Sequence, residues 1–229
     1  MNDIAGALSG NSLESDVFPR LAEEGRLLGT SYDGYFIDIG IPTDYREADS
    51  QFPIALRRPA VFFDRDMVLN EDAGYTYQPS QFRWVSGARE AIKLCNDAGY
   101  FVFVVTNQAG VARGYYDETA VRNLHAWMNE DLRSLGAHID DFRYCPHHPE
   151  GVIPSLSKEC SCRKPKPGMI LHLLKTWPVI AEGSVLIGDK TSDIEAGRAA
   201  DICSHQFVGG NLAEFVTSVM PTRSIGYAQ

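Results

Sequence analysis

Two aspartates separated by one residue follow an apolar run, and residues of this type and spacing can carry out phosphoryl chemistry. The stretch Val61–Asn70 reads VFFDRDMVLN, so Asp64 and Asp66 come directly after the apolar letters VFF. Such a run predicts a short buried strand, and alternate residues of a strand point the same way. Both carboxylates would then face one cation and one phosphate. A strand end with two solvated acids explains this stretch alone equally well.

Polar groups follow other apolar runs in the same way. Thr106-Asn107-Gln108 follows the run YFVFVV, Arg163-Lys164 ends a loop that contains cysteines, and Gly188-Asp189-Lys190 follows SVLI, with Asp193 close behind. The carboxyl ends of parallel strands meet at one edge of the sheet, and α/β proteins place their sites there. The shared position favours a functional site over ordinary loop chemistry.

These groups suit the hydrolysis of a phosphate monoester. Asp64 can attack phosphorus, and Asp66 can protonate the leaving oxygen and then activate water. Asp64 and Asp189 offer oxygen ligands for Mg²⁺. Donors from Thr106, Asn107 and Lys164 would hold the phosphoryl oxygens, while we expect Asp193 to orient its neighbours. The predicted chemistry is Mg²⁺-dependent phosphoryl transfer through an aspartyl-phosphate.

A second cluster has the composition of a structural zinc site. Cys145-Pro146-His147 and Cys160-Ser161-Cys162 supply three thiolates and one imidazole, the set of a closed tetrahedral site. The zinc would fold a loop with little apolar content and so position Arg163 and Lys164. His148 is the alternative imidazole, and the plainer interpretation is three free surface thiols.

Apolar runs and amphipathic segments alternate from residue 60 onward, which is typical of a doubly wound α/β fold with a parallel sheet and helices on both faces. The interval between Asp64 and Thr106 leaves no room for an inserted cap domain. We predict strands at Ala60–Asp64, Tyr100–Thr106, Ile139–Tyr144, Ser184–Gly188 and Ile202–Val208, and helices at Ser86–Ala98, Asp117–Leu135, Gly168–Thr176 and Ser192–Ala200.

The motifs after about residue 57 resemble those of the haloacid-dehalogenase (HAD) superfamily: DRDMV for its D-x-D motif, the strand-ending Thr106, Lys164, and GDKTSD. Within that superfamily, FFDRD-x-V-x-N, TNQAGVARGYY, CPHHP, CSCRKPKPGM and the GDK turn are similar to the D-glycero-D-manno-heptose 1,7-bisphosphate phosphatase family. The resemblance implies an HAD-like fold without a cap and with a zinc-binding loop.

The same resemblance implies residue roles. Asp64 would be the nucleophile and Asp66 the acid/base, and Mg²⁺ would be bound by Asp64, Asp189 and the backbone carbonyl of Asp66. Thr106 and Lys164 would hold the phosphoryl group, and Arg163 would recognise the substrate. Zinc would be bound by Cys145, His147, Cys160 and Cys162, and the substrate pocket would be lined by Asp72, Ala73, Gly74, Tyr75, Asn107, Gln108 and Ala109.

One position departs from the family pattern. The residue after the second aspartate is usually glycine, and here it is Met67. Either the backbone there requires a positive φ, which costs methionine about 1 kcal/mol or more, or the glycine only allows close approach of a substrate and Met67 narrows the pocket.

Residues 12–49 resemble the C-terminal end of the catalytic domain of sugar nucleotidyltransferases, in the pattern SLE-DVFP-LA-GRL followed by GYF-DIG-P-DY. We interpret residues 1–56 as a remnant of such a domain plus a linker over 50–58, and residues 57–229 as the phosphatase domain. Within the remnant we expect a helix capped by Ser12 that reaches Glu24, a hairpin of strands 26–32 and 34–39, and a helix from Pro42 through Ala48.

Composition limits the partners. The 229 residues carry a net charge of −9, which argues against a nucleic-acid surface but permits an anionic small molecule. No apolar run is long enough to span a bilayer, and the first residues lack a signal-peptide pattern. We therefore expect a cytoplasmic protein, monomeric or weakly dimeric, that binds a small sugar phosphate and neither nucleic acid nor membrane.

Three functions remain compatible with the sequence. The first is hydrolysis of a sugar phosphate, specifically at C7 of D-glycero-D-manno-heptose 1,7-bisphosphate. The second is histidinol-phosphate hydrolysis, an activity of a related zinc-loop family. The third is a catalytically silent, zinc-stabilised scaffold, against which the intact Asp64, Asp66, Thr106, Lys164 and Asp189 argue.

Overall fold

The computed structural model describes residues 12–31, 35–71 and 74–221. These residues fall into two compact units, 12–38 and 39–221 with the gaps just given. The first unit contains a π-helical turn (Leu13–Val17) and α1 (Phe18–Glu23). Ser12 caps this segment by accepting a hydrogen bond from the backbone N–H of Ser15, as expected from the sequence.

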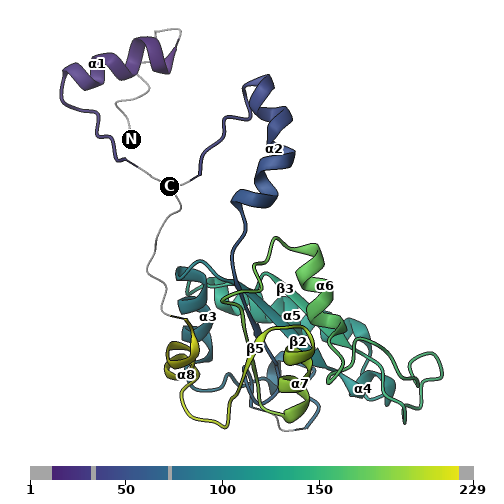
Figure 1. Cartoon of the computed structure of the whole chain (residues 1–229). Helices are drawn as coiled ribbons and strands as arrows, with labels where there is room; N and C mark the ends of the chain where they lie inside the picture. Colours follow the sequence, from purple (N-terminus) through teal and green to yellow (C-terminus); the bar gives the residue numbers. More distant parts are fainter. Residues whose placement is uncertain (1–11, 32–34, 72–73, 222–229) are drawn as a thin grey trace. The chain divides into compact units, whose positions relative to one another are not determined.

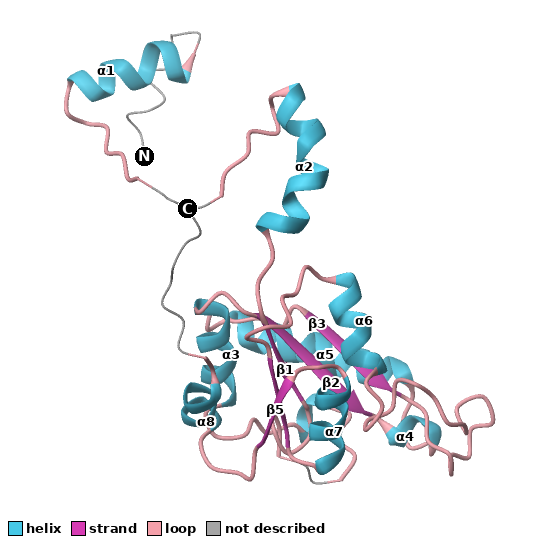
Figure 2. Ribbon diagram, in the orientation of Figure 1, coloured by secondary structure: helices cyan, strands magenta, loops and turns pink. Residues whose placement is uncertain are grey.

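A five-stranded parallel sheet forms the centre of the second unit, in the order β3-β2-β1-β4-β5 (Figures 1 and 2). This sheet confirms the predicted α/β fold. The strands are β1 (Ala60–Phe63), β2 (Phe101–Asn107), β3 (Asp141–Cys145), β4 (Val185–Gly188) and β5 (Cys203–Gln206), and the helices are α2 (Pro42–Ala55), α3 (Ala88–Asp97), α4 (Ala109–Ala112), α5 (Glu118–Arg133), α6 (Gly168–Thr176), α7 (Thr191–Ala199) and α8 (Leu212–Val219).

Alternate residues of the strands enter two separate apolar cores. Val61 and Phe63 of β1 pack with α3, α5 and α8, whereas Ala60 and Phe62 pack with α6 and α7 on the opposite face (Figure 2). All four side chains are fully buried. A strand that is covered on both faces has no polar positions, which explains the unbroken apolar run before Asp64.

Three sequence expectations differ from the structure. Among described residues, 26–31 and 35–39 form no strand, so the predicted hairpin is wrong there, and its Asp33-Gly34 turn lies outside the described residues. The predicted linker is helical up to Ala55, and Pro53 lies inside α2. The helix continues past this proline because its missing N–H donor removes only one hydrogen bond near the end of the helix. Helix α8 was not predicted, although Asn211 caps an apolar pattern at Leu212, Phe215, Val216 and Val219.

The connection between β1 and β2 is short. Its described residues form loops, a 3₁₀ turn (Pro79–Gln81) and α3, with no additional domain. None of the described helices is long and apolar enough to cross a membrane.

Candidate active site

The polar residues expected at the strand ends converge at the carboxyl edge of the sheet. Asp64 follows β1, Thr106 lies near the end of β2, and Asp189 follows β4. Lys164 arrives from the loop before α6, and its ammonium lies 2.8 Å from Asp64 Oδ1 and 2.6 Å from Asp193 Oδ1. The same ammonium donates to the carbonyl of Val105 at 2.8 Å, so the lysine is fixed between the strands.

Burial and charge compete at this ion-paired cluster. Asp64 is 6% exposed, and its burial raises the pKa of the carboxyl to about 6, although the nearby Lys164 ammonium lowers it in part. Burial alone would lower the pKa of Lys164, but the carboxylates of Asp64 and Asp193 outweigh this effect and raise it. The lysine therefore remains a cation, and its three N–H donors are directed at Asp64, Asp193 and the Val105 carbonyl.

The three carboxylates Asp64, Asp189 and Asp193 can offer oxygen atoms that all lie within 4.8 Å of one another. Asp189 Oδ1 is buried and has no hydrogen-bond partner among the described residues, as expected of a ligand for a cation. Asp193 differs, because its Oδ1 pairs with Lys164 and its Oδ2 accepts from the N–H of Lys190 at 2.9 Å. The donor set fits Mg²⁺, with Asp193 holding its neighbours in place.

Asp66 lies beside this cluster and is tied to β2. Gln108 Nε2 donates to Asp66 Oδ2 at 3.1 Å and to Thr106 Oγ1 at 2.9 Å. The Oε1 atom of Gln108 accepts from the hydroxyl of Tyr116 and from Arg65. Gln108 is 1% exposed, so these bonds are shielded from water. They fix the position of Asp66, the candidate acid/base, relative to Thr106, the candidate hydrogen-bond donor to the phosphoryl group.

Asn107 is also occupied by the protein itself. Its side chain donates to the carbonyl of Lys164 at 3.0 Å and accepts from the N–H of Lys164 at 3.1 Å. These two bonds hold the main chain of the lysine loop against the end of β2. Asn107 therefore positions the loop that carries Lys164, and its role as a donor to phosphate stays a prediction.

The cysteine cluster brings together the residues expected to bind zinc. Cys145 Sγ lies 3.5 Å from Cys160 Sγ and 3.3 Å from Cys162 Sγ, and His147 Nδ1 lies 3.4 Å from Cys162 Sγ. His148 does not belong to this group: its Nδ1 accepts from the N–H of Glu150, and its Nε2 lies 3.5 Å from Arg113 Nη2. These short separations fit four ligands around one Zn²⁺.

Residues 145–162, which carry the candidate zinc ligands and are called the zinc loop, lead directly into Arg163 and Lys164. Arg163 directly follows Cys162, and its Nη1 donates to the carbonyl of His147 at 3.2 Å. Burial raises the pKa of the Cys145 thiol, so zinc binding there requires loss of a proton. Folding of the zinc loop therefore places Arg163 and Lys164.

The expected substrate loop is described only in part. Asp72 and Ala73 lie outside the described residues, whereas Gly74 is exposed with a φ of 92°. Tyr75 follows with a φ of 58°, and its hydroxyl accepts from Arg113 at 2.9 Å. Ala109, the remaining residue of the predicted pocket, begins α4 and is half-buried.

Met67 adopts the backbone conformation that favours glycine. Its φ is 68°, and its N–H donates to the carbonyl of Asn70 at 2.7 Å, which closes the turn after Asp66. The side chain is half exposed. The positive φ thus accounts for the glycine that is usual at this position.

Replacing Met67 with glycine is expected to stabilise the folded protein by up to about 1 kcal/mol, because relief of left-handed strain exceeds the added entropy of the unfolded chain. Urea denaturation measures the change. Met67→Ala is the matched control, since alanine removes the long side chain but keeps the Cβ atom. An equal gain in both variants would contradict an origin in the backbone.

Arg65 and Tyr116 hold the site together although neither was predicted from the sequence to do so. Arg65 is 1% exposed and binds both oxygens of Asp66, while Tyr116 stacks on Tyr77 and donates to Gln108. An arginine between two aspartates at the end of a buried strand was a usable signal for Arg65. Tyr116 lies in a run of polar and aromatic residues that has no comparable pattern.

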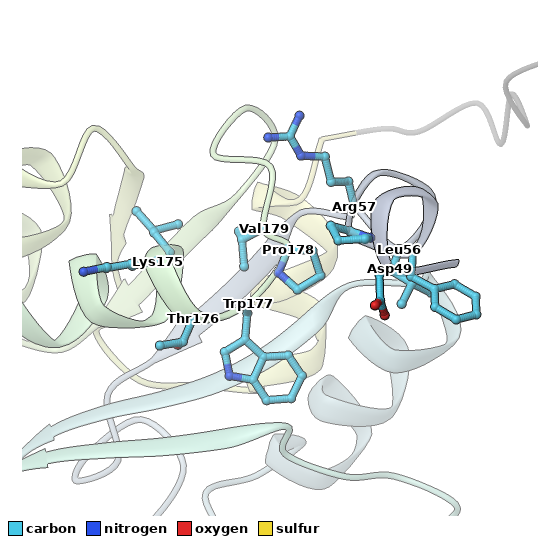
Figure 3. Close-up of a pocket in the computed structure, with 11 residues that line it drawn as sticks. Asp49, Leu56, Arg57, Lys175, Thr176, Trp177, Pro178 and Val179 are labelled. Atoms are coloured by element: carbon cyan, nitrogen blue, oxygen red, sulfur yellow. The ribbon is translucent and has the colours of Figure 1, made fainter. Parts of the chain in front are cut away.

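A cavity of about 600 Å³ lies away from these carboxylates and does not belong to the site (Figure 3). Asp49, Leu56 and Arg57 line it from α2 and the residues that follow, and Trp177 to Val179 line it from the segment after α6. Residues 58 and 179 are bridged at the amino end of β1. The carboxylates stand at the other end of that strand.

Comparison with known proteins agrees with this geometry. An HAD-hydrolase-like family model matches residues 161–207, which include Lys164, Asp189 and Asp193. The D-glycero-beta-D-manno-heptose-1,7-bisphosphate 7-phosphatase of Rhodopseudomonas palustris is 49% identical over 166 residues, covering 72% of this chain and 92% of the relative. The D-glycero-alpha-D-manno-heptose-1,7-bisphosphate 7-phosphatase of Photorhabdus laumondii is 44% identical over 141 residues, covering 62% and 77%.

A solved structure is similar in fold. The D,D-heptose 1,7-bisphosphate phosphatase of B. bronchiseptica, complexed with magnesium and phosphate, has a TM-score of 0.59 and 29% identity, covering 71% of this chain and 88% of the other. The chain therefore belongs to the D-glycero-D-manno-heptose-1,7-bisphosphate 7-phosphatase family of the HAD superfamily.

Proposed function

We propose that this chain is a Mg²⁺-dependent phosphatase that releases the C7 phosphate of D-glycero-D-manno-heptose 1,7-bisphosphate. The observation that carries the proposal is the convergence of Asp64, Asp66 and Lys164 at one edge of the sheet, with the lysine ammonium 2.8 Å from Asp64 Oδ1. The names of the relatives support the choice of substrate.

The chemistry proceeds in two half-reactions. A carboxylate oxygen of Asp64 attacks phosphorus, the bond between phosphorus and the sugar oxygen breaks, and Asp66 gives its proton to that oxygen. Water then attacks phosphorus, passes a proton to Asp66, and displaces Asp64 as a carboxylate. Mg²⁺ bound by Asp64, Asp189 and the carbonyl of Asp66 would neutralise charge on the phosphoryl oxygens.

We assign the substrate contacts to groups at the same strand ends, with Lys164 exchanging one of its protein partners for a phosphoryl oxygen. Lys164 and Thr106 hold the transferred phosphoryl group, and Arg163 contacts the rest of the substrate. Gly74, Tyr75 and Ala109 would contact the substrate beside Asn107 and Gln108, whose side chains also bind Lys164 and Asp66.

Phosphate release from the bisphosphate tests the proposal. The purified protein is given each anomer of the heptose bisphosphate, with and without Mg²⁺, and histidinol phosphate is run in parallel. We expect Mg²⁺-dependent release of one phosphate per molecule and a remaining heptose 1-phosphate, identified by phosphorus NMR. Loss of the C1 phosphate instead, or faster release from histidinol phosphate, would overturn the assignment.

Replacing Gly188 with alanine is expected to slow phosphate release by roughly 10–100-fold, because small displacements of catalytic groups have effects of this size. A Cβ atom at this position would lie 2.2 Å from the Cβ of Asp193, whose carboxylate pairs with Lys164. Steady-state kinetics measures the loss. Gly29→Ala is the control, since its Cβ would meet no atom within 4 Å. Full activity of Gly188→Ala would show that Asp193 does not position the lysine.

We further propose that residues 1–56 are a nucleotidyltransferase remnant with its linker and that residues 57–229 are the catalytic domain. The protein would be monomeric or weakly dimeric, located in the cytoplasm, and without nucleic-acid or membrane partners. A chain that begins at residue 57 is expected to keep the kcat of the full chain. Loss of activity in a folded truncated protein would assign a catalytic contribution to the first 56 residues.

A further inference from the structure

Arg65 is one of the largest fully buried side chains of the protein, and it is bound to the candidate acid/base. Its Nε lies 3.0 Å from Asp66 Oδ1, and its Nη2 lies 2.8 Å from Oδ1 and 3.1 Å from Oδ2. The Nη2 atom also donates to the carbonyl of Thr76 at 2.8 Å and to Gln108 Oε1 at 3.2 Å. The guanidinium thus fixes both carboxylate oxygens.

The backbone places Arg65 for this contact. Its N–H donates to Asp64 Oδ1 at 2.7 Å, and its carbonyl accepts from the N–H groups of Leu69 and Asn70 at 2.8 and 3.1 Å. The chain therefore turns tightly after β1. The Arg65 side chain enters the interior and contacts Asp66, while the carboxylate of Asp64 faces Lys164.

Folding alone gives little reason for an arginine at this position. Its Nη1 is buried and has no hydrogen-bond partner among the described residues, an arrangement that destabilises a fold. The side chain of Asp66 is 20% exposed, so water can reach the carboxylate without the arginine. A buried ion pair can often be replaced by apolar residues with no loss of stability. The contact therefore points to a role in the chemistry.

We infer that Arg65 is the positioning residue that fixes the orientation of the Asp66 carboxylate during breakdown of the aspartyl-phosphate. This inference rests on the proposed phosphatase mechanism. Water attacks phosphorus, the bond between phosphorus and the Asp64 oxygen breaks, and the water proton passes to the Asp66 carboxylate. A guanidinium that contacts both carboxylate oxygens holds the carboxylate in one orientation and prevents its rotation away from the water.

Gln108 strengthens the same arrangement from β2. It accepts from Arg65, donates to Asp66, and is held by the hydroxyl of Tyr116 at 2.8 Å. The base is therefore oriented by two buried side chains from two strand ends. The first half-reaction depends on Asp66 as an acid only when the leaving group needs a proton, which allows an experiment to separate the two steps.

Hydrolysis of p-nitrophenyl phosphate by Arg65→Met with Mg²⁺ tests the inference, because its leaving group departs without a proton. We expect the burst of nitrophenolate in the first turnover to stay within about threefold of wild type. The steady-state rate should fall by roughly 10–100-fold, since general base catalysis contributes factors of this size or more. Phosphorylated Asp64 should accumulate, as detected by mass spectrometry after acid quenching.

Three further variants complete the experiment. Asp66→Asn is expected to give the same pattern, Arg65→Lys a smaller loss because a cation remains, and Arg89→Met no change, since Arg89 is an exposed arginine paired at 3.5 Å with Asp131. If Arg65→Met does not fold, Arg65→Lys carries the comparison. A parallel fall of burst and steady-state rates, or no fall in either, would overturn the inference. The aryl substrate keeps this result separate from failure of the heptose assignment.

Discussion

Asp64→Asn is expected to lower phosphate release by at least roughly 10⁴-fold, because the variant lacks the nucleophile of the first half-reaction. The amide cannot form the acyl phosphate, and it removes one negative ligand from the proposed Mg²⁺ site. Initial rates with the heptose bisphosphate measure the loss. The exposed Asp97, which pairs with Lys93 on α3, provides the control Asp97→Asn, for which no change in rate is expected.

The same substitution is expected to stabilise the metal-free protein at neutral pH. Burial raises the pKa of Asp64 to about 6 in the folded protein, above its ordinary value in the unfolded chain. Keeping the carboxylate charged thus reduces stability by about 1–3 kcal/mol above pH 6, and this cost disappears as the pH falls and the folded protein binds the proton.

Thermal denaturation in Mg²⁺-free buffer between pH 5 and pH 8 measures this difference. Asp64→Asn should melt at a higher temperature than wild type at pH 8, and the gap should narrow toward pH 5. Added Mg²⁺ should reverse the order, because only wild type keeps the full ligand set. A less stable Asp64→Asn at pH 8 without Mg²⁺ would mean that the ion pair of Asp64 with Lys164, at 2.8 Å, outweighs the cost of burial.

Removal of zinc is expected to have the second large effect, and Cys162→Ser provides the test. Cys162 Sγ lies 3.3 Å from both Cys145 Sγ and Cys160 Sγ, so the substitution removes a central ligand. Structural zinc supplies folding free energy directly, and its loss should destabilise the protein by several kcal/mol. Because Arg163 follows Cys162 directly, phosphate release should fall by at least roughly tenfold as the loop loses its geometry.

Metal content, thermal denaturation and phosphate release check this expectation together. Wild type should contain one zinc per chain, and Cys162→Ser should contain substantially less. Cys203→Ser is the control, because this thiol is exposed on β5 outside the cluster. A Cys162→Ser protein with unchanged stability and activity would show that the cluster does not support the site.

The sequence predicted those elements whose patterns are local. Val61 to Phe63 alternate between two cores, so the run before Asp64 had to be apolar throughout, and that run located β1. Asp117 caps α5, and its apolar stripe marked the buried face. The paired cysteines and His147 were recognisable because each pair of ligands lies within three residues of chain.

The boundaries of the N-terminal elements depended on more than local pattern. Pro53 suggested a linker, but its cost is confined to one hydrogen bond near the end of α2. The residues of the expected hairpin that are described contain no strand, since alternation alone does not supply a partner for the backbone.

Residues such as Asp64, Asp66, Lys164 and Asp189 could be nominated from the sequence, because each follows an apolar run or belongs to a motif of fixed spacing. Only the tertiary structure showed which hydrogen bonds the residues beside them make. Asn107 binds the main chain of a loop 57 residues away, and Gln108 joins Asp66 to Thr106. The hydrogen-bond partners of a buried amide or guanidinium come from segments that are distant in sequence. A local sequence pattern therefore cannot predict them, and the contacts of Arg65 could be identified only from the folded structure.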